Sequence, residues 1–182
     1  EAAGGTTLLA TGDRDSLQLV DDATTVLLAT NKETIPMDPA AIREKYGIDD
    51  PQLVRDILAL WGDASDNIPG VAGVGAKTAL DLIARFHTLD NIYNNLDELD
   101  IKPGVKAKLK NDKEKAYLSL KLGTISTEAP IDTDINSYVI SGRDEQKAVS
   151  QFVRLELFSL IPKFDLDPNK AAEAEEEETA ER

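Results

Sequence analysis

The chain has 182 residues, of which 41% are hydrophobic, and it carries a formal net charge of −14. This length and apolar content suffice for one globular domain with a core, or for a domain and a tail. The chain has no cysteine and one histidine, His87. Disulfides and thiolate metal sites are therefore excluded, a histidine zinc site or a Ser-His-Asp triad is disfavoured, and any metal must be held by oxygen ligands.

Neither a run of eighteen apolar residues nor a secretory leader pattern occurs, so we expect a cytoplasmic protein with no membrane contact. The negative net charge argues against nucleic acid as a partner, because phosphate binding depends on lysine and arginine. The charge is uneven, however: residues 68–122 carry nine bases and seven acids, whereas the segments on either side are strongly acidic. The middle of the chain can therefore still face a nucleic-acid backbone.

The first third of the chain predicts a small sheet. Residues 6–11 (TTLLAT) are a short β-branched run between glycines, which is typical of a buried strand in a parallel sheet. A helix is expected over residues 14–20, a second strand over 24–30, and a short third strand over 33–35 that pairs with it through an Asn-Lys turn. Two or three strands make a very small sheet, so we expect further strands upstream of this sequence.

The rest of the chain predicts helices. Asp38-Pro39 and Asp50-Pro51 each combine a capping aspartate with a proline suited to the first helical turn. Apolar residues at helical spacing, up to and including Trp61, give the second of these helices one inward face. The fold class is α/β, predominantly helical, with the remnant of a parallel sheet followed by a helical region. Further helices are expected over residues 77–86, 88–92, 103–109, 112–122 and 141–157.

Two pairs of aspartates are candidate metal ligands. Asp13 and Asp15 follow the first predicted strand, at the end where open α/β sheets place ligands, and Asp63 and Asp66 lie three residues apart at a helix end. Four converging carboxylates would repel one another unless a hard cation neutralised them, and Mg²⁺ or Mn²⁺ is the oxygen-preferring choice. Either pair taken alone is more simply a set of helix caps and turns.

Residues 67–79 (NIPGVAGVGAKTA) predict a tight, phosphate-binding turn. It fails the pattern of a nucleotide-binding phosphate loop because Ala76 separates the last glycine from the Lys-Thr pair, and instead it is similar to a helix-hairpin-helix turn. Exposed amides beside a helix N-terminus attract phosphate without reading bases. The bland alternative is a turn that only packs two helices. The candidate phosphate contacts are Gly70, Gly73, Gly75, Lys77 and Thr78.

A lysine-rich run between residues 101 and 121 is a second candidate DNA contact. Lys102, Lys106, Lys110 and Lys113 would share one face if a single helix ran through them. The alternative is a solvated helix face with no partner.

Four segments in this order resemble the 5′ nuclease domain of bacterial DNA polymerase I, a relative of the flap endonucleases. They are TGDRDS (11–16), KYGI (45–48), WGDASDNIPGVAGVGAKTA (61–79) and RLELFSLIPKF (154–164), and the likeness covers about residues 5–166. In that family, clustered aspartates hold two divalent metals that hydrolyse a phosphodiester near the 5′ end of a DNA strand. A helix-hairpin-helix (helix-three-turn-helix) element grips the duplex there, often with a bound K⁺. The ligands of one metal would be Asp13, Asp15, Asp63 and Asp66.

The resemblance implies a division of the chain into three parts. Residues 1–67 would be the C-terminal part of the nuclease core, 68–166 the helix-hairpin-helix DNA-binding region, and 167–182 an acidic disordered linker or tail. The family's first strand, the ligands of its other metal and its helical arch have no counterpart here. We therefore expect this chain alone to be catalytically incomplete.

Three functions compete at this point. The first is part of a 5′-3′ exonuclease or 5′-flap endonuclease in DNA replication and repair. Its partners would be duplex DNA with a 5′ flap or nick and the remaining polymerase domains, and it would act as a monomer in the bacterial cytoplasm, at the nucleoid. The second is a non-catalytic helix-hairpin-helix DNA-binding module whose aspartates are only caps. The third, a phosphoryl-transfer enzyme with Lys77 as its phosphate-loop lysine, predicts nucleotide binding, which we do not expect.

Overall fold

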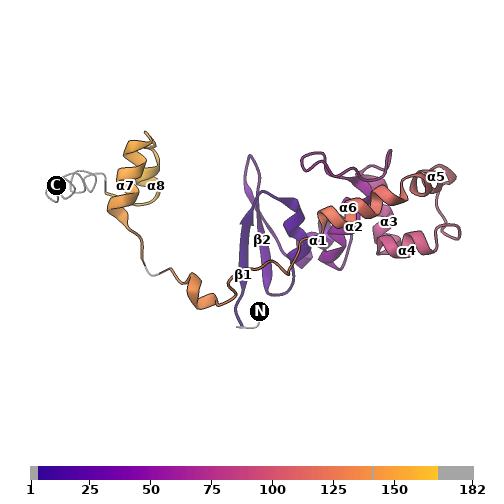
Figure 1. The fold of residues 1–182 in the computed structure, drawn as a ribbon, viewed down its shortest axis with the longest axis horizontal. Helices are drawn as coiled ribbons and strands as arrows, with labels where there is room; N and C mark the ends of the chain where they lie inside the picture. Colours follow the sequence, from indigo (N-terminus) through magenta and orange to yellow (C-terminus); the bar gives the residue numbers. More distant parts are fainter. Residues whose placement is uncertain (1–3, 141, 168–182) are drawn as a thin grey trace. The chain divides into compact units, whose positions relative to one another are not determined.

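The computed structural model describes residues 4–140 and 142–167 (Figure 1). These residues fall into two compact units that divide between Glu128 and Ala129. The predicted boundary at residue 67 stays a prediction, and the first unit spans both sides of it with one hydrophobic core. The acidic tail beyond residue 167 lies outside the described residues. Within the described part of the chain, no helix is long and apolar enough to span a membrane.

A three-stranded sheet opens the first unit, in the order β1-β2-β3 (Figure 1). β1 (Thr7–Thr11) pairs parallel with β2 (Thr24–Ala29), and β2 pairs antiparallel with β3 (Thr34–Met37). All three strands confirm the sequence prediction. The prediction that β1 is buried is wrong: it pairs on one side only, and Leu8 is 69% exposed. The central strand β2 buries Val26 and Leu28, and β3 buries Met37.

Short helices follow the first and third strands. The helix predicted over residues 14–20 is the 3₁₀ helix η1 (Arg14–Leu19), and its Leu17 is fully buried. A tight turn begins it, because the Asp13 side chain accepts from the N–H of Asp15 at 2.9 Å. The helix α1 (Pro39–Tyr46) begins at Asp38, which caps it by accepting from the third following N–H as predicted.

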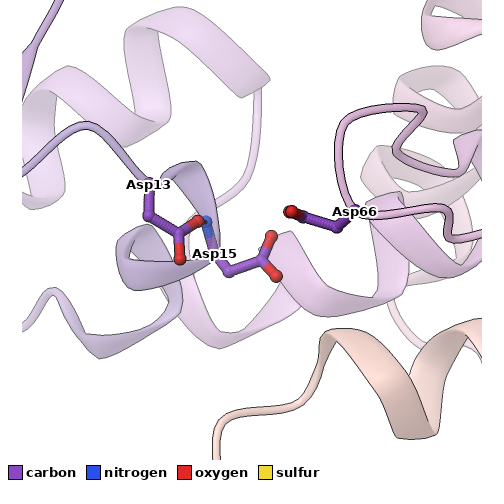
Figure 2. A group of neighbouring side chains, drawn as sticks. All are labelled: Asp13, Asp15 and Asp66. Carbon is purple, nitrogen blue, oxygen red and sulfur yellow. Dashed lines mark hydrogen bonds between the residues drawn. The ribbon is translucent and has the colours of Figure 1, made fainter.

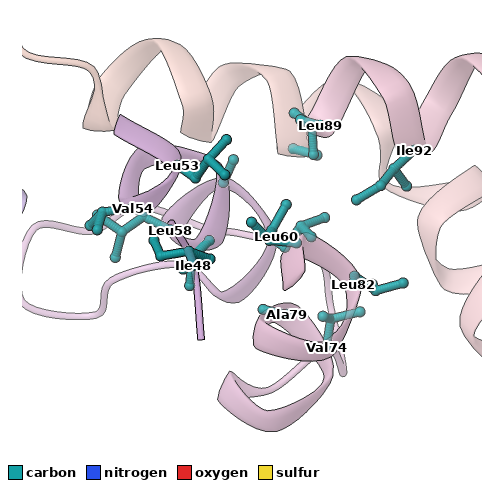
Figure 3. Packing of buried hydrophobic residues seen from close by; sticks show 14 of the residues in the cluster. Ile48, Leu53, Val54, Leu58, Leu60, Val74, Ala79, Leu82, Leu89 and Ile92 are labelled. Carbon is teal, nitrogen blue, oxygen red and sulfur yellow. The ribbon is translucent and has the colours of Figure 1, made fainter. Parts of the chain in front are cut away.

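Most of the remaining helices of the first unit pack against α2. The predicted helix after Asp50-Pro51 begins as the 3₁₀ helix η2 (Pro51–Leu53) and continues as α2 (Val54–Trp61). Helix α2 packs against α3 and α6, and its buried side chains form the core with those of α3 and α4 (Figure 3). This packing fixes the loops at the end of α2, where the candidate site lies. The other helices are α3 (Ala76–Phe86), α4 (Leu89–Asn94), α5 (Pro103–Asn111) and α6 (Lys113–Gly123).

The second unit is small. It contains the 3₁₀ helix η3 (Ile135–Tyr138) and two helices, α7 (Glu145–Arg154) and α8 (Leu160–Lys163). The predicted helix over residues 141–157 is longer than α7, because the Asp144 side chain caps the helix by accepting from Lys147 N–H at 2.8 Å. Three buried side chains form the core of this unit: Val149, Ile161 and Leu166.

One charged side chain is buried in the core of the first unit. Asp56 on α2 is 3% exposed, and its carboxylate accepts from the N–H of Leu89 at 2.8 Å, at the first residue of α4. Burial raises the pKa of Asp56, an effect partly offset by this hydrogen bond and by the neighbouring Arg55. Asp56 thus satisfies a backbone donor that α4 cannot satisfy itself.

The raised pKa of Asp56 predicts a pH-dependent stability difference. Because folding disfavours the ionised form, the contribution of Asp56 to the free energy of unfolding is largest below pH 4 and declines as the pH rises through its folded pKa. We expect Asp56→Asn, which keeps an acceptor for Leu89, to gain stability relative to the wild type between pH 4 and pH 7. Urea unfolding at the two pH values measures this, and an unchanged difference would contradict it.

Candidate metal centre and nucleic-acid interface

Three of the four predicted carboxylates meet at one point. Asp13 and Asp15 come from the turn after β1 and the start of η1, and Asp66 comes from the loop after α2 (Figure 2). One carboxylate oxygen from each lies within 4.8 Å of the others, and Asp66 points toward Asp15 across the gap. Within the described residues, this is the one group of three acidic side chains with such geometry. Carboxylate oxygens at this separation can coordinate one cation together.

Asp15 is the most perturbed member of this cluster. Its Oδ1 atom is buried and has no hydrogen-bond partner among the described residues. Burial, followed in order of effect by the negative charges of Asp13, Asp66 and Asp63, raises the pKa of Asp15 to about 6. A buried carboxylate oxygen without a donor is costly unless a cation neutralises it. The donor set, all carboxylate oxygen, fits a hard divalent ion.

Asp63 lies beside the cluster and outside its closest group. Its carboxylate accepts from both the N–H of Ser65, at 2.8 Å, and the Ser65 hydroxyl. These hydrogen bonds lower the pKa of Asp63. Its charge still acts on Asp15, so a role for Asp63 as a ligand stays a prediction. In the structure, Asp63 shapes the loop that carries Asp66.

The cluster borders a cleft that also contains an arginine. The cleft has a volume of about 550 Å³ and is lined by Gly12, Asp13, Arg14, Asp63, Ser65 and Asp66. Arg14 is exposed and forms no ion pair within the described residues, although its charge lowers the pKa of Asp63. An unpaired guanidinium beside carboxylates is suited to an anionic ligand that arrives with a metal. The TGDRDS segment contained this signal, but the sequence prediction assigned Arg14 no role.

A buried glutamine anchors the turn that carries Asp13 and Asp15. Gln18 Nε2 donates to the carbonyls of Asp15 at 2.9 Å and Gly123 at 2.8 Å, and its Oε1 accepts from the N–H of Ile125. These bonds join η1 to the end of α6, more than a hundred residues away. A lone glutamine in a short helix gives no sequence signal for such a contact. The prediction therefore missed Gln18.

The loop of Asp66 is joined directly to the glycine turn. Asp63 and Ile68 form an antiparallel bridge, with N–H to carbonyl distances of 3.0 and 2.8 Å. Gly62 and Gly70 cross so closely that a Cβ on Gly70 would lie 2.5 Å from the backbone nitrogen of Gly62. Gly70 also has a φ of +61°, which L side chains rarely adopt. The loop that carries Asp63 and Asp66 is therefore held directly against the glycine turn.

Side chains from α5 and α6 hold the glycine turn from behind. Gly70 N–H donates to the Ser119 hydroxyl and Ala72 N–H to the Asp112 carboxylate, both at 2.9 Å. The ammonium of Lys108 donates to the Gly73 carbonyl at 2.8 Å. The expectation that the glycines of this turn leave their amides exposed is wrong for Gly70, because its N–H is already paired inside the protein, as is that of Ala72. Contact of Gly70, Gly73 or Gly75 with phosphate stays a prediction.

The first turn of α3 carries the remaining predicted contacts. Gly75 precedes the helix and provides no side-chain cap. Lys77 and Thr78 follow it, and together with Lys102 from the start of α5 they line a second cleft of about 720 Å³. The structure therefore brings Lys77 and Lys102 to one surface, although 24 positions separate them in the sequence. Whether that surface binds DNA is not tested by these contacts.

The lysine run does not form one helical face. The chain breaks between α5 and α6 at Asp112, so Lys113 starts a new helix. Lys106 donates to the Asp97 carbonyl at 2.8 Å, and Lys110 pairs with the Asp97 carboxylate. These two lysines hold the α4–α5 connection, and their contact with DNA stays a prediction.

The geometry agrees with a known family. A family model described as "5'-3' exonuclease, C-terminal SAM fold" matches residues 49–146, more than half of the chain. The chain belongs to this 5′-3′ exonuclease family. The matched residues of this chain run from the turn before α2 through α6 and into the second unit. They include Asp63, Asp66 and the whole glycine turn.

Curated relatives match most of the chain. The chain is 38% identical over 156 residues to DNA polymerase I of Bacillus caldotenax, covering 85% of this chain and 18% of that protein. It is 40% identical over 145 residues to a 5′-3′ exonuclease of Buchnera aphidicola (subsp. Acyrthosiphon pisum), covering 77% of this chain and 50% of the relative. The chain therefore spans half or less of the length of these relatives.

Solved structures of phage T5 5′-exonuclease are similar in fold. One with bound zinc is 26% identical and matches 65% of this chain and 42% of its own, with a TM-score of 0.56. Another, described as a pseudo-enzyme-product complex of the T5 flap endonuclease with DNA and metal ions, gives the same TM-score and identity over 64% of this chain and 42% of its own.

The repulsion at Asp15 predicts a gain of stability on its neutralisation. Without a divalent ion, we expect Asp15→Asn to raise the free energy of unfolding at pH 7 by about 1 kcal/mol, after discounting for partial exposure. The reason is that the amide removes one of several neighbouring charges. Thermal unfolding in EDTA measures this, with Asp22→Asn on an exposed turn as the matched control. A loss of stability in Asp15→Asn would contradict the electrostatic account.

Proposed function

We propose that this chain is part of a metal-dependent 5′-3′ exonuclease or 5′-flap endonuclease that hydrolyses phosphodiester bonds in DNA. The observation that carries the proposal is the cluster of Asp13, Asp15 and Asp66, with its unpartnered buried oxygen. The loop that supplies Asp66 to this cluster is joined directly to the glycine turn. The family membership and the T5 structures with metal ions and DNA support it. That this chain contributes to the exonuclease activity for which some of its longer relatives are named is part of the proposal.

The carboxylates would hold Mg²⁺ or Mn²⁺. Asp13, Asp15 and Asp66 supply the oxygens, and Asp63 stands beside them with its position fixed by Ser65. A divalent ion at such a site supplies Lewis-acid polarisation of a phosphoryl oxygen and lowers the pKa of water. Arg14 adds a positive charge at the same cleft and would hold a phosphate oxygen of the bound strand. The chain thus positions one phosphodiester between carboxylates and guanidinium.

The glycine turn and the start of α3 would hold the duplex. Lys77 and Lys102 line a common cleft. Neither lysine forms an ion pair within the described residues. Because the Asp63–Ile68 bridge fixes this turn relative to the carboxylates, a duplex held by its backbone would present one phosphate to Asp66 at a set distance. Such positioning makes the reaction effectively intramolecular.

A potassium ion at the turn is the less supported part of the proposal. The Gly73 carbonyl, an oxygen of the kind that K⁺ would need, already accepts from the ammonium of Lys108. Lys108 thus supplies a positive charge to the turn from the protein itself. A requirement for K⁺ stays a prediction of the family resemblance.

The non-catalytic DNA-binding module remains the second candidate. One observation favours it: the described residues contain a single carboxylate cluster, whereas phosphodiester hydrolysis of this type commonly uses two ions about 3.5–4 Å apart. We therefore expect this chain to bind DNA and to cleave it slowly at most.

In the longer relatives the setting would be the bacterial cytoplasm, with polymerase domains on the same chain and a nick or 5′ flap as the preferred DNA structure.

Binding to a duplex with a single-stranded 5′ tail tests the proposal. We expect the logarithm of affinity to fall with the logarithm of salt concentration, and Lys77→Ala to reduce that slope by about one, because one phosphate contact is lost. Fluorescence anisotropy of the labelled duplex in MnCl₂ over a series of KCl concentrations measures the slope. Lys32→Ala, at an exposed turn of the sheet, is the matched control and should leave it unchanged.

Two results would count against the proposal. An unchanged slope in Lys77→Ala would remove α3 from the DNA interface. Cleavage of the tail in MgCl₂ provides the other arm, in which any hydrolysis should disappear in Asp63→Ala. Rapid hydrolysis that persists in this variant would show that the carboxylates are not the catalytic site.

A further inference from the structure

Trp61 is the member of its predicted helical face that the structure leaves exposed. Val54, Ile57 and Leu58 on the same face of α2 are 2–6% exposed, whereas Trp61 is 42% exposed. It is the last residue of α2 and directly precedes Gly62 and the carboxylate loop. A large aromatic surface left open beside a polar cleft marks a place where a ligand can cover it.

A small apolar pocket lies against this tryptophan. The Trp61 pocket, as we call it, has a volume of about 190 Å³ and is lined by Arg14, Tyr46, Val54, Ile57, Leu58, Trp61, Gly62, Asp63 and Ala64. Ligand pockets for drug-sized molecules have about 300–1,000 Å³, so this one has room for a single flat ring system. Tyr46 is half-buried, and burial raises the pKa of its phenol. The ring thus stays neutral at physiological pH.

The Trp61 pocket adjoins the cleft of about 550 Å³ that borders Asp13 and Asp66. Arg14 and Asp63 line both of them. The guanidinium of Arg14 acts electrostatically on Tyr46 on one side and on Asp63 on the other. A ligand with a flat ring and an adjacent phosphate would therefore find an aromatic wall, a guanidinium and the carboxylate cluster in succession. A nucleotide of a DNA strand has such a flat ring, its base, next to a phosphate.

We propose that the Trp61 pocket receives one unpaired nucleobase of the strand whose phosphate lies at the carboxylates. The indole of Trp61 and the phenol of Tyr46 stack on the base, and Arg14 holds the phosphate next to it. Stacking on aromatic side chains does not depend on base identity, which suits a nuclease without sequence preference. This proposal rests on the proposed function and names the part of the substrate that the function leaves open.

The protein provides its own reporter for the test. Trp61 is the single tryptophan of the chain, so its fluorescence reports on the pocket alone. The probes are two duplexes that differ in a single-stranded 5′ tail of thymidines or of abasic residues, in CaCl₂. We expect the thymidine tail to quench Trp61 emission and to bind about 5- to 150-fold more tightly than the abasic tail, from the usual strength of base–aromatic stacking.

Variants locate the effect. Trp61→Ala should abolish the preference for the thymidine tail in an anisotropy assay, while Trp61→Phe should keep part of it. Leu118→Ala, at another exposed apolar side chain of the first unit, should leave the preference intact, and circular dichroism checks that each variant is folded.

The outcomes separate the two proposals. Equal affinity for both tails with no quenching, while duplex binding remains salt-dependent and sensitive to Lys77→Ala, would overturn the pocket and leave the proposed function standing. Failure to bind either duplex would overturn both. A thymidine preference that persists in Trp61→Ala would place the base elsewhere and overturn the pocket.

Discussion

The pair of backbone hydrogen bonds between Asp63 and Ile68 joins two features that would otherwise be independent. On one side of this bridge stands the loop with Asp66, and on the other stands the glycine turn that leads into α3. The close crossing of Gly62 and Gly70 makes the join compact, since a side chain on either glycine would collide with backbone. The loop that carries Asp66 and the glycine turn therefore keep a constant separation.

Electrostatic repulsion is the cost of this arrangement. Asp15 is partly buried beside three other acids, and this burial and these charges raise its pKa. One of its oxygens has no hydrogen-bond donor within the described residues. Hydrogen bonds between residues distant in sequence hold the site together against this repulsion. Gln18 holds the η1 turn to the end of α6, while Ser119 and Asp112 hold the glycine turn. Stability and charge clustering are thus opposed at this site, as expected where a cation is to be bound.

Local patterns predicted most of the fold, and distant contacts account for the errors. The three strands, the Asp38 cap and the helix after Gly75 follow from signals within a few residues. The exposure of β1 depends on how many neighbours the strand has, which its own sequence does not encode. The convergence of Asp13, Asp15 and Asp66 was predicted from topology and family resemblance. The roles of Gln18, Lys108 and Asp112 could not be predicted, because each depends on which segments fold against one another. Arg14 has a local signal in TGDRDS, between two candidate ligands, which the sequence prediction did not use.

Direct measurement of Mn²⁺ binding tests the central claim, that three carboxylates from two distant segments form one cation site. Titration followed by electron paramagnetic resonance counts the bound ions, since free and bound Mn²⁺ give different signals. The account predicts one ion per chain in the wild type, loss of that ion in Asp66→Asn, and retention in Asp22→Asn, an exposed aspartate outside the cluster. Equal binding by the wild type and Asp66→Asn would contradict it.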